Sequence, residues 1–166
     1  MGTFKRTVMV RERHPGELRV YLDTSVIGGC LDPTFRDASN ALLEAVRRGD
    51  TIAVISELTL LEIQEAPAAV REILDRLPES HIEEIALTEE CAILAQQYIA
   101  AGVIDESKLV DAQHIAMATV YHVDVLVSWN FRHIVNLERI RGYNSVNMKY
   151  GYPLLEIRSP REVGQP

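Results

Sequence analysis

The sequence predicts an α/β fold with three layers, α/β/α, built around a central, mostly parallel sheet of four to five strands. Two observations support this prediction. Short apolar runs rich in strand-forming residues alternate along the chain with segments whose apolar residues recur every three or four positions, as on one face of a helix. The 166 residues, 47% of them hydrophobic, are enough for one domain with its own core.

We divide the chain into three parts. Residues 1–17 are charged, show no hydrophobic period and include a His-Pro-Gly sequence, which is typical of a flexible leader. Residues 18–160 contain the periodic segments and form a single predicted domain, and residues 161–166 form a C-terminal tail. We find no internal repeat, low-complexity tract or interdomain linker.

The first half of the domain predicts two strands, each followed by helical sequence. The apolar run RVYLD, residues 19–23, predicts a strand that ends abruptly at its aspartate. Residues 36–48 predict an amphipathic helix, because their apolar side chains recur at spacings of three and four, and Gly49 ends it. TIAVIS predicts the second strand, and its last residue, Ser56, is suited to cap the next helix.

The second half continues this alternation. Pro67 suits the first turn of a helix, HIEEIAL predicts the third strand, and Thr88 caps a helix that ends at Gly102. Ser107 opens a helix with the sequence KLVDAQHIAMATVYH, and VDVLVS predicts the fourth strand. Residues 131–143 predict a last helix, and LLEIRSP predicts a fifth strand.

Composition bears on the compartment and the partners. Cys30 and Cys91 are too few for a disulfide framework and have no zinc-like spacing to histidines, so we expect buried thiols in a reducing cytoplasm. No stretch approaches the roughly 18 apolar residues of a membrane span. The net charge of −7 argues against a broad basic nucleic-acid surface, although basic residues gather at 132–134 and 138–142.

Three acidic residues follow strands or occupy early helical turns. Asp23 closes the first strand, Glu62 lies in the helix after the second, and Asp111 falls in the first turn of the helix that Ser107 opens. Ligands of parallel sheets bind beyond the carboxyl ends of the strands, where these side chains are expected to meet. Clustered carboxylates need a cation to stabilise them, and Mg²⁺ and Mn²⁺ prefer oxygen ligands.

Four segments in this order, YLDTSVI, SELTLLEI, KLVDAQHIAMA and VLVSWNFRHI, resemble the PIN-domain ribonucleases over about residues 19–160. Within that family the chain is most similar to bacterial and archaeal proteins of the VapC toxin type. The resemblance implies a PIN-like fold and a magnesium- or manganese-dependent endonuclease that cleaves single-stranded RNA. It also implies a homodimer and an inhibitory antitoxin protein as partners.

Carried over to this chain, the resemblance assigns Asp23, Glu62 and Asp111 as metal ligands and adds Asn130 as a fourth catalytic residue. Many members carry an aspartate where Asn130 stands. An amide oxygen can ligate a cation but brings no negative charge, so a second metal ion should bind more weakly. The candidates for substrate binding are Thr24, Ser25, Lys108, Ser128, Arg132 and His133.

Each candidate also has a purely structural alternative. Asp23 and Asp111 are suited to helix starts, where a carboxylate caps amides or favours the positive end of the helix. Glu62 alone fits a solvated helix position, but its apolar neighbours favour a partner for its charge. His114 fits either a hydrogen-bonded core histidine, which we favour, or a group beside the site. For Trp129 we favour packing over stacking on a base.

Two other functions compete with the nuclease. A phosphatase of the haloacid dehalogenase type also begins with a strand ending in aspartate, but it needs a second aspartate where this chain has Ser25. A PIN-like module that has lost catalysis and only binds RNA or protein is the stronger alternative. Asn130 favours that module, whereas the three acidic residues favour an enzyme.

Overall fold

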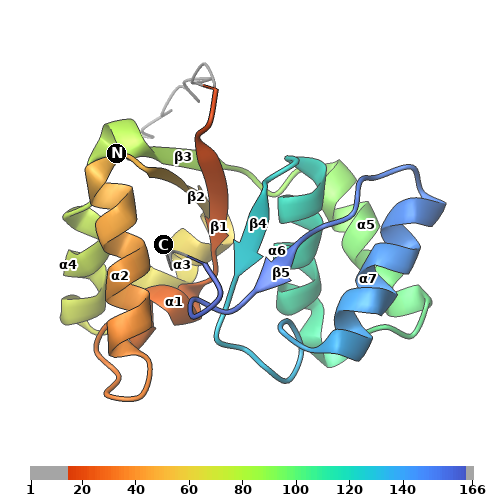
Figure 1. Cartoon of the computed structure of the whole chain (residues 1–166). Coiled ribbons are helices and arrows are strands. Elements are labelled where there is room, and N and C mark those ends of the chain that lie inside the picture. The colour runs from red at the N-terminus through yellow and green to blue at the C-terminus, as the bar shows by residue number, and fades with distance from the viewer. Residues whose placement is uncertain (1–14, 164–166) are drawn as a thin grey trace, which may run out of the picture.

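The computed structural model describes residues 15–163, and Figure 1 shows them as three layers with the sheet in the middle. The described residues contain one parallel sheet of five strands in the order β3-β2-β1-β4-β5. The strands are β1 (Leu18–Leu22), β2 (Thr51–Ser56), β3 (Ile82–Ile85), β4 (Val125–Val127) and β5 (Ile157–Arg158). The predicted fold class is therefore confirmed. Residues 1–14 of the predicted leader and 164–166 of the predicted tail lie outside the described residues.

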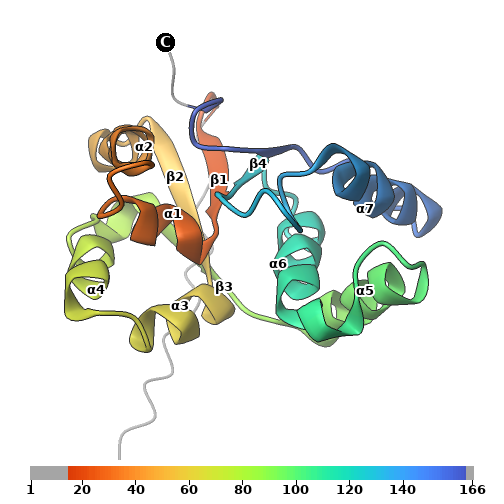
Figure 2. The same ribbon diagram turned by 90° about the horizontal axis from the view of Figure 1, so that it is seen from below.

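Helices cover both faces of the sheet (Figure 2). One face carries α1 (Thr24–Gly29), α2 (Arg36–Arg48), α3 (Glu57–Gln64) and α4 (Ala68–Asp75), and the other carries α5 (Glu89–Ala100), α6 (Leu109–Val120) and α7 (Leu137–Lys149). Short 3₁₀ helices span Glu79–His81 and Glu106–Lys108. No helix among residues 15–163 is long and apolar enough to cross a membrane.

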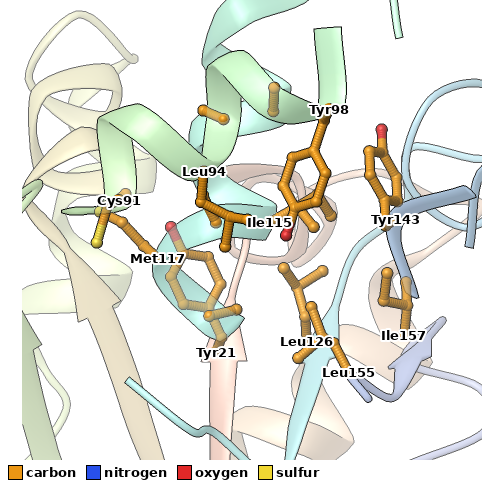
Figure 3. Close-up of a cluster of buried hydrophobic side chains, with 14 of the residues drawn as sticks. Tyr21, Cys91, Leu94, Tyr98, Ile115, Met117, Leu126, Tyr143, Leu155 and Ile157 are labelled. Carbon is orange, nitrogen blue, oxygen red and sulfur yellow. The ribbon is translucent and has the colours of Figure 1, made fainter. Parts of the chain in front are cut away.

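The two helical layers enclose separate halves of the core because successive strand residues point to opposite faces. Tyr21, Val54 and Leu126 belong to the cluster beneath α5, α6 and α7, part of which Figure 3 shows. Their neighbours Val20 and Val125 belong to the cluster beneath α1 to α4. Burial on both faces explains why these strands are almost continuously apolar.

Local capping chemistry sets several helix ends where the sequence predicts them. The Ser56 and Thr88 hydroxyls accept hydrogen bonds from backbone N–H groups in the first turns of α3 and α5. Gly49 and Gly102 follow α2 and α5 with φ of +83° and +73°, a left-handed conformation that glycine adopts without strain.

Three predicted elements have different bounds. The helix predicted over 131–143 is wrong in its first turns, because α7 begins at Leu137 and its cap is Asn136, whose side chain accepts from the Arg139 N–H. The fifth strand pairs with β4 over only two residues. The 3₁₀ helix before α6 is capped by Asp105, whose carboxylate accepts from the Ser107 N–H, so the cap lies two residues before the predicted one.

The strand order determines where a ligand can bind. The chain passes from β1 outward to β2 and β3, then returns through α5 and α6 to place β4 on the other side of β1. The connections after β1 and β4 therefore diverge to opposite faces, and at such a switch point parallel sheets bind ligands beyond the carboxyl ends of the strands. Asp23 follows β1 and Ser128 follows β4, so both lie at this switch point.

Candidate active site

Asp23 is held at the carboxyl end of β1 by two hydroxyl groups. It is 7% exposed, and although it precedes α1, its side chain makes no capping hydrogen bond. Its Oδ2 accepts from the Ser25 hydroxyl at 2.7 Å and from the Ser128 hydroxyl at 2.8 Å. Because both bonds go to one oxygen, Oδ1 is available to another partner.

The two serines are themselves held by backbone amides of the loop after β4. The Ser25 hydroxyl accepts from the Trp129 N–H at 2.9 Å, and the Ser128 hydroxyl accepts from the Asn130 N–H at 2.9 Å. Each hydroxyl has one proton, which it donates to Asp23. The sequence predicts Ser25 and Ser128 as substrate-binding residues, and in this structure they fix the Asp23 carboxylate.

Glu62 reaches the site from α3, the helix that follows β2. Its side chain is 42% exposed, and its Oε1 lies 2.6 Å from Nε2 of His114. The same imidazole nitrogen is 4.0 Å from Oδ1 of Asp23. His114 on α6 therefore lies next to both carboxylates, one directly after β1 and the other on α3.

Asp111 lies one turn before His114 on α6 and is half-buried. Burial raises the pKa of its carboxyl above the ordinary value, and the charge of Asp23 raises it further, while His114, His133 and Lys108 oppose the shift. Asp111 is three residues from His114, so it lies on the face of α6 that His114 presents to Asp23 and Glu62.

The charges of all three predicted metal ligands act on the imidazole of His114. Burial alone lowers the pKa of its imidazole, but the hydrogen bond to Glu62 and the charges of Asp23, Glu62 and Asp111 outweigh burial, so the pKa lies above its ordinary value. Two of the three carboxylates, Glu62 and Asp23, therefore lie 2.6 and 4.0 Å from Nε2 of this histidine, which is 1% exposed, and Asp111 precedes it by one helical turn.

The donor set fits a hard divalent cation in chemistry, although the carboxylates do not converge on a point. Within residues 15–163, no group of three or more His, Cys, Asp or Glu side chains is close enough to hold a metal ion together. Two observations support the fit: Oδ1 of Asp23 has no hydrogen-bond donor among the described residues, and the adjacent Thr24 hydroxyl is buried without a partner there.

Asn130 has a local structural role. Its side-chain oxygen accepts from the backbone N–H groups of Arg132 and His133, at 3.2 and 3.0 Å, and so holds the turn after β4. Its assignment as a catalytic residue stays a prediction. Arg132 is exposed, whereas Nδ1 of His133 is buried without a hydrogen-bond partner in the described part of the chain. Lys108 is exposed at the start of α6.

The aromatic residues of this loop divide into one that packs and one that is presented to solvent. Trp129 is 6% exposed, stacks on Phe35 with ring centroids 4.3 Å apart, and donates from Nε1 to the Ser39 hydroxyl at 2.8 Å. The predicted packing role therefore holds. Arg161, in the predicted tail, lies over the Trp129 ring at 5.1 Å. Phe131 is 46% exposed beside the site.

Sequence reasoning missed Phe131 and the contact of His114 with Glu62. For Phe131 the signal is its position directly after Asn130, in a segment whose other aromatic residue, Trp129, packs in the core. The signal for His114 is its spacing of three from Asp111, which places both on one helix face. Its partner on α3 is 52 residues away and has no local signature.

Comparison of the sequence with protein-family models finds no match, and comparison with curated proteins finds none either. Solved structures do match. One is VapBC2 from Rickettsia felis, solved with a DNA fragment from its promoter. It aligns with a TM-score of 0.53 and 14% identity, and the alignment covers 86% of this chain and 98% of that chain. FitAcB from Neisseria gonorrhoeae aligns with a TM-score of 0.55 and 16% identity, covering 87% and 99%. The chain therefore has the fold of these structures, as its resemblance to PIN domains predicts.

Proposed function

We propose that this protein is a metal-dependent endoribonuclease that cleaves single-stranded RNA. The observation that carries the proposal is the Asp23 carboxylate. It is buried at the switch point of the sheet and fixed through one oxygen by two serines, and its other oxygen lies 4.0 Å from the imidazole nitrogen that contacts Glu62. A carboxylate with a fixed orientation at a switch point is suited to cation binding, because hydrogen bonds to a metal ligand orient it toward the ion.

In this proposal Asp23, Glu62 and Asp111 hold Mg²⁺ or Mn²⁺. A bound divalent cation supplies an activated water and offsets the negative charge that develops on the phosphoryl oxygens during hydrolysis. The protein contributes the orientation of the ligands. Ser25 and Ser128 fix Asp23, and His114 fixes Glu62.

Three basic side chains lie at the start of α6 or in the loop after β4. Lys108 and His133 lie close enough to Asp111 to oppose the rise in its pKa, and Arg132 is exposed in the same turn as His133. Local cations of this kind bind phosphate oxygens even on a protein with a net charge of −7. We assign them to the RNA backbone, and we assign the exposed ring of Phe131 to a base, because base stacking tolerates any sequence.

We also propose an antitoxin partner and a homodimer. The fold shared with VapBC2, which was solved with a promoter DNA fragment, supports the antitoxin, and the resemblance to PIN domains supports the homodimer. For the antitoxin we expect a small reading frame beside the gene for this chain. That reading frame should encode a DNA-binding protein, and the two products should co-purify. A monomeric mass by light scattering at working concentration would reject the dimer.

Cleavage of a mixed single-stranded RNA pool tests the enzyme. The intact chain is compared with Asp23→Asn and Asp111→Asn, each in Mg²⁺, Mn²⁺ or chelator. The control is Asp50→Asn, an identical change at an exposed residue just before β2, at the opposite end of the sheet. We expect cleavage only with metal, unchanged in Asp50→Asn and lowered more than about 100-fold in the other two variants, beyond the range for outer-shell residues.

The second candidate function is a binding module without catalysis, and Asn130 favours it. The amide brings no negative charge where many PIN domains carry an aspartate. Its oxygen already accepts two backbone N–H groups of the turn after β4. RNA binding by the intact chain without cleavage in any metal would support the module and reject the enzyme.

A further inference from the structure

Tyr21 and His114 form a buried hydrogen-bonded connection between the core and Glu62. We infer that both are positioning residues for Glu62: they hold one carboxylate oxygen, so that the other is presented to the cation. This inference rests on the proposed function, and it extends the working parts of the site to Tyr21, the fourth of the five residues of β1, which is 0% exposed.

Glu62 needs such a restraint. Its side chain is 42% exposed and has three rotatable bonds, so without a partner it would sample many orientations in water. Among residues 15–163 the group that donates to its carboxylate is His114, at 2.6 Å from Nε2 to Oε1. This contact leaves Oε2 available, in the same way that the serines leave Oδ1 of Asp23 available.

His114 is in turn held by Tyr21. The Tyr21 hydroxyl lies 2.5 Å from Nδ1 of His114, and the two rings meet edge to face with centroids 5.7 Å apart. The imidazole is 1% exposed, so no water competes for its nitrogens. With one ring nitrogen bound to Tyr21 and the other to Glu62, the imidazole has a single orientation.

The connection closes on the helix that carries Glu62. The Tyr21 hydroxyl donates to Ser56 at 2.7 Å, and the Ser56 hydroxyl accepts from the Thr59 N–H at 3.1 Å as the N-cap of α3. The closed path therefore runs from the cap of α3 through β1 and α6 back to Glu62 on α3. It fixes both the start of α3 and the carboxylate that the helix presents.

Tyr98 provides a matched control for Tyr21. Both are 0% exposed and belong to the same core cluster, and Figure 3 shows both rings. The Tyr98 hydroxyl bonds to Asn147 at 2.5 Å and lies 3.4 Å from Thr119, with no contact to the acidic cluster. Removing either hydroxyl costs one buried hydrogen-bonding group, but only the Tyr21 hydroxyl supports Glu62.

The experiment compares Tyr21→Phe with Tyr98→Phe by three measurements: denaturant unfolding, Mn²⁺ binding by calorimetry without RNA, and single-turnover RNA cleavage. We expect both variants to lose similar stability. Tyr21→Phe should bind Mn²⁺ about 10-fold more weakly, the lower end of the effect of losing an outer-shell partner. Tyr98→Phe should bind Mn²⁺ as the intact chain does.

A second pair tests the histidine. His114→Phe keeps a ring but offers no donor to Glu62, and we expect it to weaken Mn²⁺ binding by about 10- to 100-fold. His114→Gln retains an amide N–H donor and should recover part of the affinity, which a purely structural role of the imidazole does not predict.

Equal Mn²⁺ affinity in Tyr21→Phe and Tyr98→Phe would overturn the inference and make Tyr21 an ordinary core residue. Failure of the intact chain to bind Mn²⁺ would also overturn it. If the intact chain binds Mn²⁺ and only Tyr21→Phe weakens the binding, but no RNA is cleaved, the positioning role stands and the nuclease proposal falls.

Discussion

The Ser128 hydroxyl donates a hydrogen bond of 2.8 Å to Oδ2 of Asp23, although 105 positions separate the two residues. The contact joins the carboxyl ends of β4 and β1, the two neighbouring strands whose connections diverge to opposite faces of the sheet. The fold thus places Asp23 at the switch point of the sheet, and this hydrogen bond fixes its carboxylate there.

Loss of this hydroxyl should therefore impair the site more than the fold. We expect Ser128→Ala to lower metal-dependent cleavage about 10- to 100-fold, because Asp23 keeps only the Ser25 bond and gains freedom of rotation. Single-turnover cleavage at saturating RNA measures the effect. Ser25→Ala should behave similarly, and a double variant that cleaves as fast as the intact chain would contradict the assignment.

Two adjacent glycines in α1 should respond in opposite ways to alanine. A Cβ at Gly29 would lie 2.7 Å from both the Ser39 hydroxyl and Nε1 of Trp129, so it would force apart their hydrogen bond. We expect Gly29→Ala to lower the free energy of unfolding by about 1–3 kcal/mol, as overpacking usually does.

Gly28→Ala is the control, because a Cβ there meets no atom within 4 Å. It should raise the free energy of unfolding by about 0.4–1 kcal/mol, since alanine restricts the unfolded chain. Denaturant titrations with equal midpoints for the two variants would show that α1 is not packed closely against Trp129.

Arg19 should not tolerate lysine. Its guanidinium binds both oxygens of Glu83, at 2.8 and 2.6 Å, and donates to the carbonyl groups of Tyr121 and His122. A lysine ammonium cannot reproduce this planar fork, so we expect Arg19→Lys to cost about 1–3 kcal/mol of stability.

Arg48→Lys serves as the comparison for Arg19→Lys. Arg48 is 57% exposed and makes one contact with Asp50, at 2.9 Å. Exposed ion pairs contribute little, so this change should shift the free energy of unfolding by less than about 0.5 kcal/mol. Similar losses in both variants would refute the special role of Arg19.

Tyr152 and Glu90 give a pH-dependent contact between α5 and the segment after α7. The Tyr152 hydroxyl donates to Glu90 at 2.6 Å, and this bond, together with burial, raises the pKa of Tyr152 to about 12 from its ordinary 10.0. An unfolded tyrosine loses its proton near pH 10. The contribution of the contact to stability is therefore complete below that pH and is lost as the pH rises from 10 to 12.

The variant Glu90→Gln should move the titration midpoint of Tyr152 downward toward 10, because the negative charge that opposes deprotonation is gone. NMR of the tyrosine ring carbons, with the resonance assigned by Tyr152→Phe, follows this midpoint. An unchanged midpoint in Glu90→Gln would exclude the hydrogen bond as the cause.

Most strands and helix ends follow from local features that the sequence contains. Apolar runs bounded by Ser56 or Thr88 identify strands and caps, since capping needs only the cap residue and the next turn. The first turns of the predicted last helix are different. Asn130 accepts two N–H groups of residues 132 and 133 through its side chain, and this competes with the apolar period of the segment.

The contact between Asp23 and Ser128 has a topological reason. Carboxyl ends of parallel strands share one edge, so residues directly after β1 and β4 must lie close together whatever their side chains do. The connection from Tyr21 through His114 to Glu62 was not predictable, because it joins β1, α6 and α3 across 93 and 52 residues. Tyr21 alone looks like any buried strand residue.

Mn²⁺ titration of four single variants tests the central claim most directly, namely that Asp23, Glu62 and Asp111 form one cation site. The variants are Asp23→Asn, Glu62→Gln, Asp111→Asn and the control Asp50→Asn, and electron paramagnetic resonance counts the free ion. We predict weaker Mn²⁺ binding in the first three variants and the affinity of the intact chain in Asp50→Asn. Equal affinities in all four variants would contradict the proposed site.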